Sequence, residues 1–272
     1  MSSHPIFRDK SLIGDISGLR IELCIIVYSY MLRTIFNWAA IVFYTSVFGT
    51  IGLLLSFTSA EKVSKYAIRP WGRSILSACG VKVYVEGVEN LPKEPSIIMY
   101  NHQSSSDIFA FSGFLPVEWR GVLKKELAKV PFVGWVTKAM GHYFVERDGS
   151  GRDTQEIRRM VEKIRSGPSV LIAPEGTRSP DGTLLPFKKG GFVVAMYAKV
   201  PVVPMVILGG KEVMPKGSMK VNPGSMKMKI LPPIDVKTLP SGREGREELM
   251  RLVREVMERA LKQEEKGMKV AL

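Results

Sequence analysis

The sequence predicts an α/β protein with a mixed, largely parallel sheet flanked by helices, preceded by an N-terminal apolar two-helix membrane anchor. Two observations predict the α/β class: short β-branched segments recur from about residue 80 onward, and segments with helical periodicity separate them. A third observation predicts the anchor, because residues 19–60 are far more apolar than the rest. We expect residues 1–66 to form membrane-associated helices and residues 67–272 to form one α/β domain.

The composition narrows the class of protein. The 272 residues include 39 Lys and Arg and 26 Asp and Glu, so the net charge is +13. With 45% hydrophobic residues, the chain is not a disordered protein. Cys24 and Cys79 are too few for a disulfide framework. The excess positive charge favours an anionic partner, which leaves nucleic acid, an anionic membrane or a phosphorylated substrate.

The apolar N-terminal segment starts too late and runs too long for a signal peptide. Between Cys24 and Ala60 the only charged residue is Arg33. Spanning a bilayer takes about 20 apolar residues, and residues 38–58 alone meet that length. Basic residues flank the segment on both sides: Arg8, Lys10 and Arg20 before it, and Lys62, Lys65, Arg69 and Arg73 after it.

These basic flanks decide the predicted topology. Positive charge is typical of the cytoplasmic side, so we expect both flanks, and the α/β domain, at the cytoplasmic face of the cell membrane. That arrangement favours two apolar helices with a break near Arg33 to Asn37, lying in one leaflet with their charged ends at the surface. A single spanning helix over residues 38–58 is the alternative.

The remainder of the chain alternates between strand and helix patterns. The predicted strands are residues 81–88, 96–100, 120–125, 142–147, 169–176, 200–208 and 226–234. Helices are predicted over residues 153–165, 190–198 and 244–262, where apolar positions recur with helical spacing. This alternation predicts a largely parallel or mixed sheet covered by helices.

A first polar motif, Asn101-His102-Gln103-Ser104-Ser105-Ser106-Asp107, directly follows a predicted strand. Its His and Asp are five residues apart, which does not place them on one face of a helix. They can meet if His102 lies in the turn after the strand and Asp107 in the first turn of the next helix, with Ser104 or Ser105 as its cap. The carboxylate would then accept from one imidazole nitrogen and leave the other as a general base.

A second polar motif, Pro174-Glu175-Gly176-Thr177-Arg178-Ser179, also follows a predicted strand. Gly176 would let the backbone approach a ligand closely, and Arg178 offers a bidentate fork for phosphate or carboxylate. Thr177 and Ser179 offer hydroxyls, and Glu175 can hold the arginine or bind a substrate hydroxyl. Alone, this motif is equally well read as a polar turn.

Together the two motifs, separated by roughly 70 residues, resemble the glycerolipid acyltransferase family. Within it they are most similar to the 1-acylglycerol-3-phosphate O-acyltransferases. Two further blocks resemble that family: residues 141–147, which include Arg147, and the apolar Val-Pro-Val-Val-Pro block at residues 200–204. The resemblance covers roughly residues 80–210, and the pair of polar motifs, the first of them an HX4D motif at residues 102–107, is highly specific.

The resemblance implies a membrane enzyme of phospholipid biosynthesis. A fatty acyl group would pass from a thioester of coenzyme A or acyl carrier protein to the 2-hydroxyl of 1-acylglycerol 3-phosphate, giving phosphatidic acid. It implies that His102 is the general base, that Asp107 orients it, and that no acyl-enzyme forms. The implied substrate-binding residues are Arg147, Glu175, Gly176, Thr177, Arg178 and Ser179.

Several lysines are candidates for anion contacts. Lys124 and Lys125 end a predicted strand and would add positive potential near the phosphate or the donor, although we favour a solvated edge. Six lysines fall between residues 211 and 237, opposed only by Glu212 and Asp235. This net charge of 6 − 2 = +4 would press the domain onto anionic headgroups, or would be an ordinary solvated face.

The sequence gives less support to other functions. The metal-ligand and nucleotide-binding motifs are absent from the sequence, so we predict neither a metal nor a nucleotide cofactor. We expect His142 to be structural. A related acyltransferase acting on glycerol 3-phosphate or another lyso-lipid is the near alternative. A serine lipid hydrolase is more remote, because there is no G-x-S-x-G elbow, and a nucleic-acid-binding motif is missing too.

Overall fold

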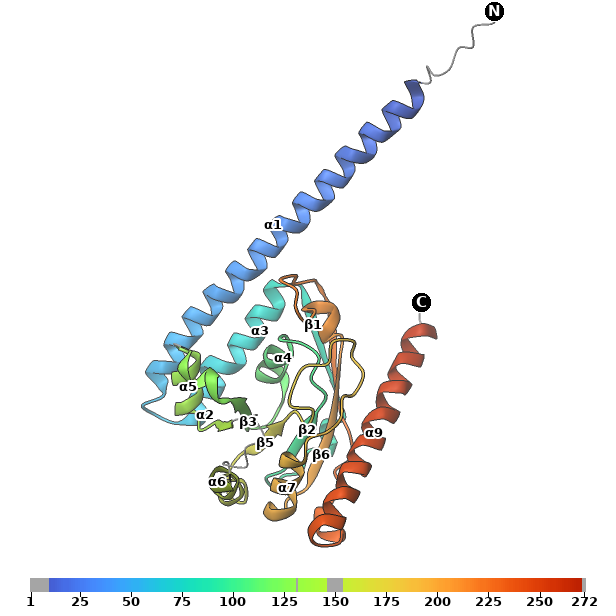
Figure 1. Cartoon of the computed structure of the whole chain (residues 1–272). Coiled ribbons are helices and arrows are strands. Elements are labelled where there is room, and N and C mark those ends of the chain that lie inside the picture. The colour runs from blue at the N-terminus through green and yellow to red at the C-terminus, as the bar shows by residue number, and fades with distance from the viewer. Residues whose placement is uncertain (1–9, 131, 146–153, 271–272) are drawn as a thin grey trace, which may run out of the picture.

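A computed structural model of the chain describes residues 10–130, 132–145 and 154–270. The described residues form a helix–sheet–helix arrangement, with α1 extending well beyond the other elements (Figure 1). The strands are β1 (Val81–Glu86), β2 (Ile97–Tyr100), β3 (Trp119–Lys124), β4 (Tyr143–Val145), β5 (Ser169–Ile172), β6 (Val202–Leu208) and β7 (Gly224–Ile230). The α-helices are α1 (Lys10–Leu55), α2 (Ala60–Val63), α3 (Arg69–Ala78), α4 (Asp107–Phe114), α5 (Val133–Ala139), α6 (Thr154–Ile164), α7 (Lys189–Ala198), α8 (Gly210–Val213) and α9 (Gly242–Val270).

The strands form one seven-stranded sheet with the order β1-β7-β6-β2-β5-β3-β4. The five strands from β6 to β4 pair in parallel, whereas β7 is antiparallel to β6 and parallel to β1. The predicted mixed, largely parallel α/β sheet is therefore confirmed. The carboxyl ends of β2, β5, β3 and β4 meet at one edge of the sheet, where loops in such folds carry functional groups.

Alternation along the central strands produces two separate cores. In β2, Ile98 faces one layer, while Ile97 and Met99 face the other, because successive side chains point to opposite faces of a strand. The first core contains residues of α1, α3 and α4, and the second contains residues of α6, α7 and α9. Buried on both faces, the central strands read as continuous apolar runs.

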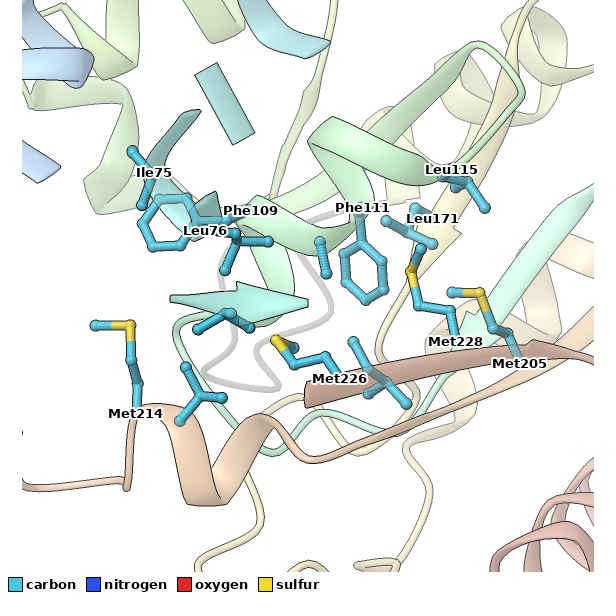
Figure 2. Packing of buried hydrophobic residues seen from close by; sticks show 14 of the residues in the cluster. Ile75, Leu76, Phe109, Phe111, Leu115, Leu171, Met205, Met214, Met226 and Met228 are labelled. Carbon is cyan, nitrogen blue, oxygen red and sulfur yellow. The ribbon is translucent and has the colours of Figure 1, made fainter. Parts of the chain in front are cut away.

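The core on the α4 side fixes the helix that follows the first polar motif. Figure 2 shows Phe109 and Phe111 of α4 among Leu76 of α3 and Met226 and Met228 of β7. Phe111 is 1% exposed and its ring meets that of Tyr100 edge-on, with centroids 4.4 Å apart. The aromatic side chains of α4 thus anchor the helix whose first residue is Asp107.

The N-terminal apolar segment is one helix, so the predicted two helices with a break near Arg33 to Asn37 are wrong. The single helix α1 runs from Lys10 to Leu55, 46 residues, which is about 69 Å at 1.5 Å per residue. Within it, Val27–Leu55 has the length and apolar character of a membrane span, and 6% of its most apolar window is buried. This apolar helix is consistent with membrane association.

Two polar side chains at this point of the helix, those of Asn37 and Trp38, have partners elsewhere in the fold. Asn37 is buried and its Nδ2 donates to the carbonyl of Val221 at 2.8 Å. Trp38 Nε1 donates to the carbonyl of Met219 at 2.7 Å. These contacts satisfy the polar side chains without interrupting the helix, and no Pro or Gly lies between residues 33 and 37 to break it.

Candidate active site

Two loops, one after β2 and one after β5, form the candidate site, and Asn101 fixes the first of them. Asn101 is 2% exposed and follows β2 directly. Its Nδ2 donates to the carbonyl of Ile207 at 3.0 Å, and its Oδ1 accepts from the Ile207 N–H at 2.7 Å. These two hydrogen bonds to the neighbouring strand β6 fix the point at which the chain leaves the sheet, and so fix the backbone position of His102.

His102 and Asp107 form a hydrogen-bonded pair. The distance between His102 Nδ1 and Asp107 Oδ2 is 2.8 Å. Because a carboxylate only accepts, we assign the proton to Nδ1, which leaves Nε2 of a neutral imidazole as an acceptor. Within the described part of the chain Nε2 has no hydrogen-bond partner, and 24% of the side chain is exposed. The predicted meeting of a turn histidine and a first-turn aspartate is confirmed.

The carboxylate of Asp107 is held by more than the histidine. Its Oδ2 also accepts from the backbone N–H groups of Gln103 and Ser104, each at 3.0 Å. Asp107 is fully buried, and its Oδ1 has no hydrogen-bond partner among the described residues. Gly210 packs against Oδ1 so closely that an added Cβ would lie 2.6 Å from it. The aspartate is therefore locked on both sides, and the two bound N–H groups are not free to stabilise an oxyanion.

The serines of this motif have structural contacts. Ser104 Oγ donates to the carbonyl of Met214 at 2.8 Å, and Ser106 Oγ donates to Ser104 Oγ at 2.8 Å. Helix α4 begins with Ser106 as N-cap, without a side-chain capping bond. The predicted cap by Ser104 or Ser105 is wrong, because Ser104 Oγ bonds to Met214 and Ser106 and Ser105 Oγ accepts from Arg178.

The two motifs are joined by direct hydrogen bonds. Glu175 Oε1 accepts from the backbone N–H of His102 at 3.0 Å, and Oε2 accepts from that of Leu185 at 2.9 Å. The backbone N–H of Ser179 donates to the His102 carbonyl at 2.7 Å. Burial raises the pKa of the Glu175 carboxyl, while these N–H donors partly oppose the shift.

These contacts change the roles expected for two predicted substrate-binding residues. Glu175 is 2% exposed, with both oxygens already bound to backbone N–H groups. Ser179 is 1% exposed, and its Oγ donates to Asp181 Oδ1 and accepts from the Gly182 N–H. Both side chains are committed to the loop, so the geometry favours a positioning role over direct substrate contact.

The residues between them are open to solvent. Thr177 is exposed, and Gly176 has a φ of 70° in the left-handed region, which favours glycine. Arg178 Nη1 donates to Ser105 Oγ at 2.6 Å, which brings its guanidinium to the His102 loop. The Arg178 carbonyl accepts from Lys216 Nζ at 2.7 Å. Arg178 is thus hydrogen-bonded to the loop that carries the His–Asp pair.

Sequence reasoning missed Lys188 at this site. Its aliphatic chain lies across Gly176, where an added Cβ would be 2.9 Å from Cδ and Cε. Its backbone N–H donates to the carbonyl of Pro174 at 2.8 Å. The only signal in the sequence is the glycine, whose lack of a side chain leaves room for the lysine.

Two of the remaining predicted contacts, Lys124 and Lys125, lie at the same edge of the sheet. Lys124 ends β3, is 55% exposed on its side chain and pairs with Glu126 at 3.2 Å. Lys125 begins the next helical turn and is exposed. Strand β4 ends at Val145, and Arg147 lies outside the described residues. The paired, exposed Lys124 fits the solvated edge that we favoured.

Two other features help to delimit the site. His142 accepts at Nδ1 from the Gly121 N–H at 2.7 Å, and burial with nearby Arg120 lowers its pKa to about 3, which fits the predicted structural role. A cavity of about 370 Å³ lies at the opposite edge of the sheet, lined by residues that include Glu89, Glu94 and Asp235. This cavity lies at the amino ends of β2 and β6, whereas the His–Asp pair follows the carboxyl end of β2, so the two are different sites.

A comparison with known proteins agrees with this geometry. A family model described as Acyltransferase matches residues 82–208, which include both loops. A structure of the 1-acyl-sn-glycerophosphate (LPA) acyltransferase from Thermotoga maritima has a TM-score of 0.75 and 32% identity, and the match covers 88% of this chain and 97% of that one. The chain belongs to the acyltransferase family.

Curated relatives carry the same description. The 1-acyl-sn-glycerol-3-phosphate acyltransferase of Saccharomyces cerevisiae is 36% identical over 187 residues, 68% of this chain and 61% of the relative. That of Pseudomonas aeruginosa is 29% identical over 214 residues, 76% of this chain and 79% of the relative. The chain spans less than two thirds of several of these relatives, including 45% of the one from Brassica napus. The resemblance seen in the sequence is confirmed.

Proposed function

We propose that the protein is a membrane-associated 1-acylglycerol-3-phosphate O-acyltransferase. It transfers a fatty acyl group from a thioester of coenzyme A or acyl carrier protein to the 2-hydroxyl of 1-acyl-sn-glycerol 3-phosphate, and the product is phosphatidic acid. The observation that carries the proposal is the 2.8 Å bond between His102 Nδ1 and the buried Asp107, with no partner for Nε2 in the part of the chain that the structure describes. The relatives of that name support the choice of acceptor.

In the proposed mechanism His102 acts as a general base. Nε2 takes the proton of the acceptor hydroxyl while its oxygen attacks the thioester carbonyl. Asp107 keeps the proton of His102 on Nδ1 and stabilises the imidazolium as it forms. When the carbon–sulfur bond breaks, the proton passes from Nε2 to the leaving thiolate. No acyl-enzyme is needed, because the acceptor oxygen attacks directly.

The second loop supplies the proposed phosphate contacts. Thr177 is exposed and Arg178 is half-buried, while the aliphatic chain of Lys188 covers Gly176. A guanidinium can bind a phosphate through two parallel hydrogen bonds, whereas carboxylates would repel it. We assign positioning roles to Glu175 and Ser179 and retain Arg147 as a proposed second phosphate contact.

A purified-protein assay with several acceptors and donors tests the proposal. We expect transfer to 1-acylglycerol 3-phosphate to exceed transfer to glycerol 3-phosphate and to lysophosphatidylcholine, with His102→Ala as the inactive control. A preference for glycerol 3-phosphate would show that the proposed acceptor is wrong, while the proposed acyl-transfer mechanism would stand. A serine hydrolase is disfavoured because Ser104 Oγ is buried and donates to Met214, and labelling of a serine by a fluorophosphonate would reverse that conclusion.

We also propose that residues 1–66 attach the catalytic domain, residues 67–272, to the cytoplasmic face of the cell membrane, on an anionic phospholipid surface. The exposed apolar helix α1 and the basic residues that follow it support this placement. Cysteines introduced at residues 5 and 65 test it by their accessibility to an impermeant reagent in sealed cells and in inverted vesicles. Residue 65 labelled only in inverted vesicles supports the cytoplasmic placement, and labelling in sealed cells contradicts it.

A further inference from the structure

The segment that links β3 to α5 exposes four large apolar side chains within nine residues. Leu127, Val130, Phe132 and Trp135 are 39%, 41%, 42% and 51% exposed. We call these four residues the η3–α5 surface, after the 3-10 helix η3 (Lys125–Lys129) and α5. Single exposed apolar residues are ordinary, whereas a close group of them marks an interaction surface.

The fold holds this segment in place and turns its apolar side outward. The opposite face of α5 is buried: Val136 and Met140 pack with Val63 and Ala67. Phe132 has a φ of 59°, which is uncommon for a residue with a side chain, and its ring lies 5.5 Å from that of Trp135. The exposed residues of α5 therefore lie on a helix that packs into a small core of its own.

The η3–α5 surface lies beside the C-terminal end of the apolar helix. Two glycines of α1 lie next to it: a Cβ at Gly49 would be 3.6 Å from Phe132 Cβ, and one at Gly52 would be 3.4 Å from Val136 Cγ1, both ordinary contact distances. Figure 1 shows α5 next to this end of α1. Leu54 and Phe57, at the end of α1 and just after it, are 67% and 86% exposed. The apolar exposure of α1 thus continues onto the catalytic domain.

Lysines surround the apolar group. Residues 124–139 contain Lys124, Lys125, Lys129 and Lys138 against Glu126, a net charge of 4 − 1 = +3. An apolar centre with basic neighbours and a Trp is the pattern of segments that sit in the headgroup layer of anionic membranes. Ion pairs occur in both basic regions: Lys124 pairs with Glu126 at 3.2 Å, and Lys227 and Lys229 of the lysine-rich stretch pair with Glu264 at 2.9 Å and 2.6 Å. The apolar centre, and not the number of lysines, distinguishes the η3–α5 surface.

We propose that the η3–α5 surface is a second membrane contact, made by the catalytic domain itself. Its apolar residues enter the headgroup region of an anionic phospholipid surface while its lysines meet the phosphates. The contact would hold the domain against the bilayer close to the end of α1. This inference rests on the membrane association of α1 and not on acyl transfer, so each can fail without the other. An acidic protein would fit the charge but not the continuity with α1.

Depth-sensitive labelling of the full chain tests this contact. The labelled variant is Val130→Cys in a Cys24→Ser background, and it carries an environment-sensitive fluorophore. The remaining cysteine, Cys79, is not labelled, because it is buried and burial raises its pKa to about 11. The protein is placed in vesicles of phosphatidylglycerol and phosphatidylcholine that contain brominated lipid. We expect emission from residue 130 to shift to the blue and to be quenched by the bromine.

Tyr197→Cys is the matched control, because Tyr197 is an apolar residue 66% exposed on α7, in the opposite helix layer. We expect its emission to remain that of a water-exposed label. Leu127→Cys repeats the test if the first variant does not fold. Equal quenching at residues 130, 127 and 197 would overturn the proposal, as would a shift that appears only with an acidic carrier protein. Unchanged quenching in pure phosphatidylcholine would overturn the part assigned to the lysines.

Discussion

Glu175 accepts a hydrogen bond at 3.0 Å from the backbone N–H of His102, 73 residues earlier in the chain. The carboxylate that follows β5 therefore fixes the backbone of the histidine that follows β2. Its second oxygen binds the Leu185 N–H, so the side chain links three loop positions. The two polar motifs form one unit held by main-chain contacts, and the chemistry of the first depends on the integrity of the second.

We predict that Glu175→Ala lowers stability and activity together. It leaves two N–H groups without their acceptor, at about 1–3 kcal/mol for each one that stays buried. The free energy of urea unfolding and the rate of acyl transfer measure the two effects. Glu175→Gln, which keeps one acceptor oxygen, should fall between the wild type and the alanine variant. An alanine variant with wild-type stability and rate would show that the link does not matter.

Gly210 should be needed to keep Asp107 in place. A Cβ at this position would lie 2.6 Å from Asp107 Oδ1, and the aspartate cannot move without losing three hydrogen bonds. Because a displacement of about 1 Å can cost about 100-fold in rate, we expect Gly210→Ala to lower kcat by roughly 10- to 100-fold with little change in KM. Gly190→Ala is the matched control, since a Cβ there meets nothing within 4 Å. Similar kcat values for the two variants would contradict this account.

Arg178 is expected to act in binding the acceptor phosphate. Lysine keeps the charge and loses the fork, so Arg178→Lys should raise KM for 1-acylglycerol 3-phosphate by about 10-fold and spare kcat. Arg178→Gln should raise it further. As a control, Arg243→Lys alters an arginine that pairs with Glu247 at 2.7 Å on α9 and should leave KM unchanged. If KM stays constant in both Arg178 variants, another residue holds the phosphate.

The loop after the second motif should weaken in acid. Hydrogen bonds from the Thr183 N–H, the Thr183 hydroxyl and the Ser179 hydroxyl lower the pKa of Asp181 from 3.8 to about 2. A depressed folded-state pKa stabilises the protein above pH 3.8, and this contribution is lost as the pH falls toward 2. The urea midpoints of the wild type and Asp181→Asn should therefore differ at pH 5 and converge near pH 2. A constant difference would assign the effect to another cause.

The sequence predicted the elements whose signal is local. The apolar strands, the order of the helices after residue 153 and the meeting of His102 with Asp107 all follow from spacing within a few residues. The contacts of Glu175 and Gly210 could not be predicted, because each joins loops 70 to 110 residues apart through a backbone group or a close approach. Only the folded chain brings these groups together.

The same reasoning explains the error in the N-terminal helix. The basic flanks favoured two helices with both ends on one side of the membrane, and the break was placed near Arg33 to Asn37, where polar groups in an apolar segment need partners. Asn37 has such a partner in Val221, 184 residues later, so helix α1 continues through this point. The helices α3 and α5, short and poorly marked in the sequence, were also found only in the structure.

The most direct test of the central claim is the rate of acyl transfer to 1-acylglycerol 3-phosphate by His102→Ala. The account predicts a loss of at least 100-fold, the usual contribution of a general base being about 100- to 10,000-fold. Asp107→Asn should lose activity as well, and both variants should keep wild-type circular dichroism and vesicle binding. A folded, membrane-bound His102→Ala protein that transfers acyl groups at the wild-type rate would contradict the account.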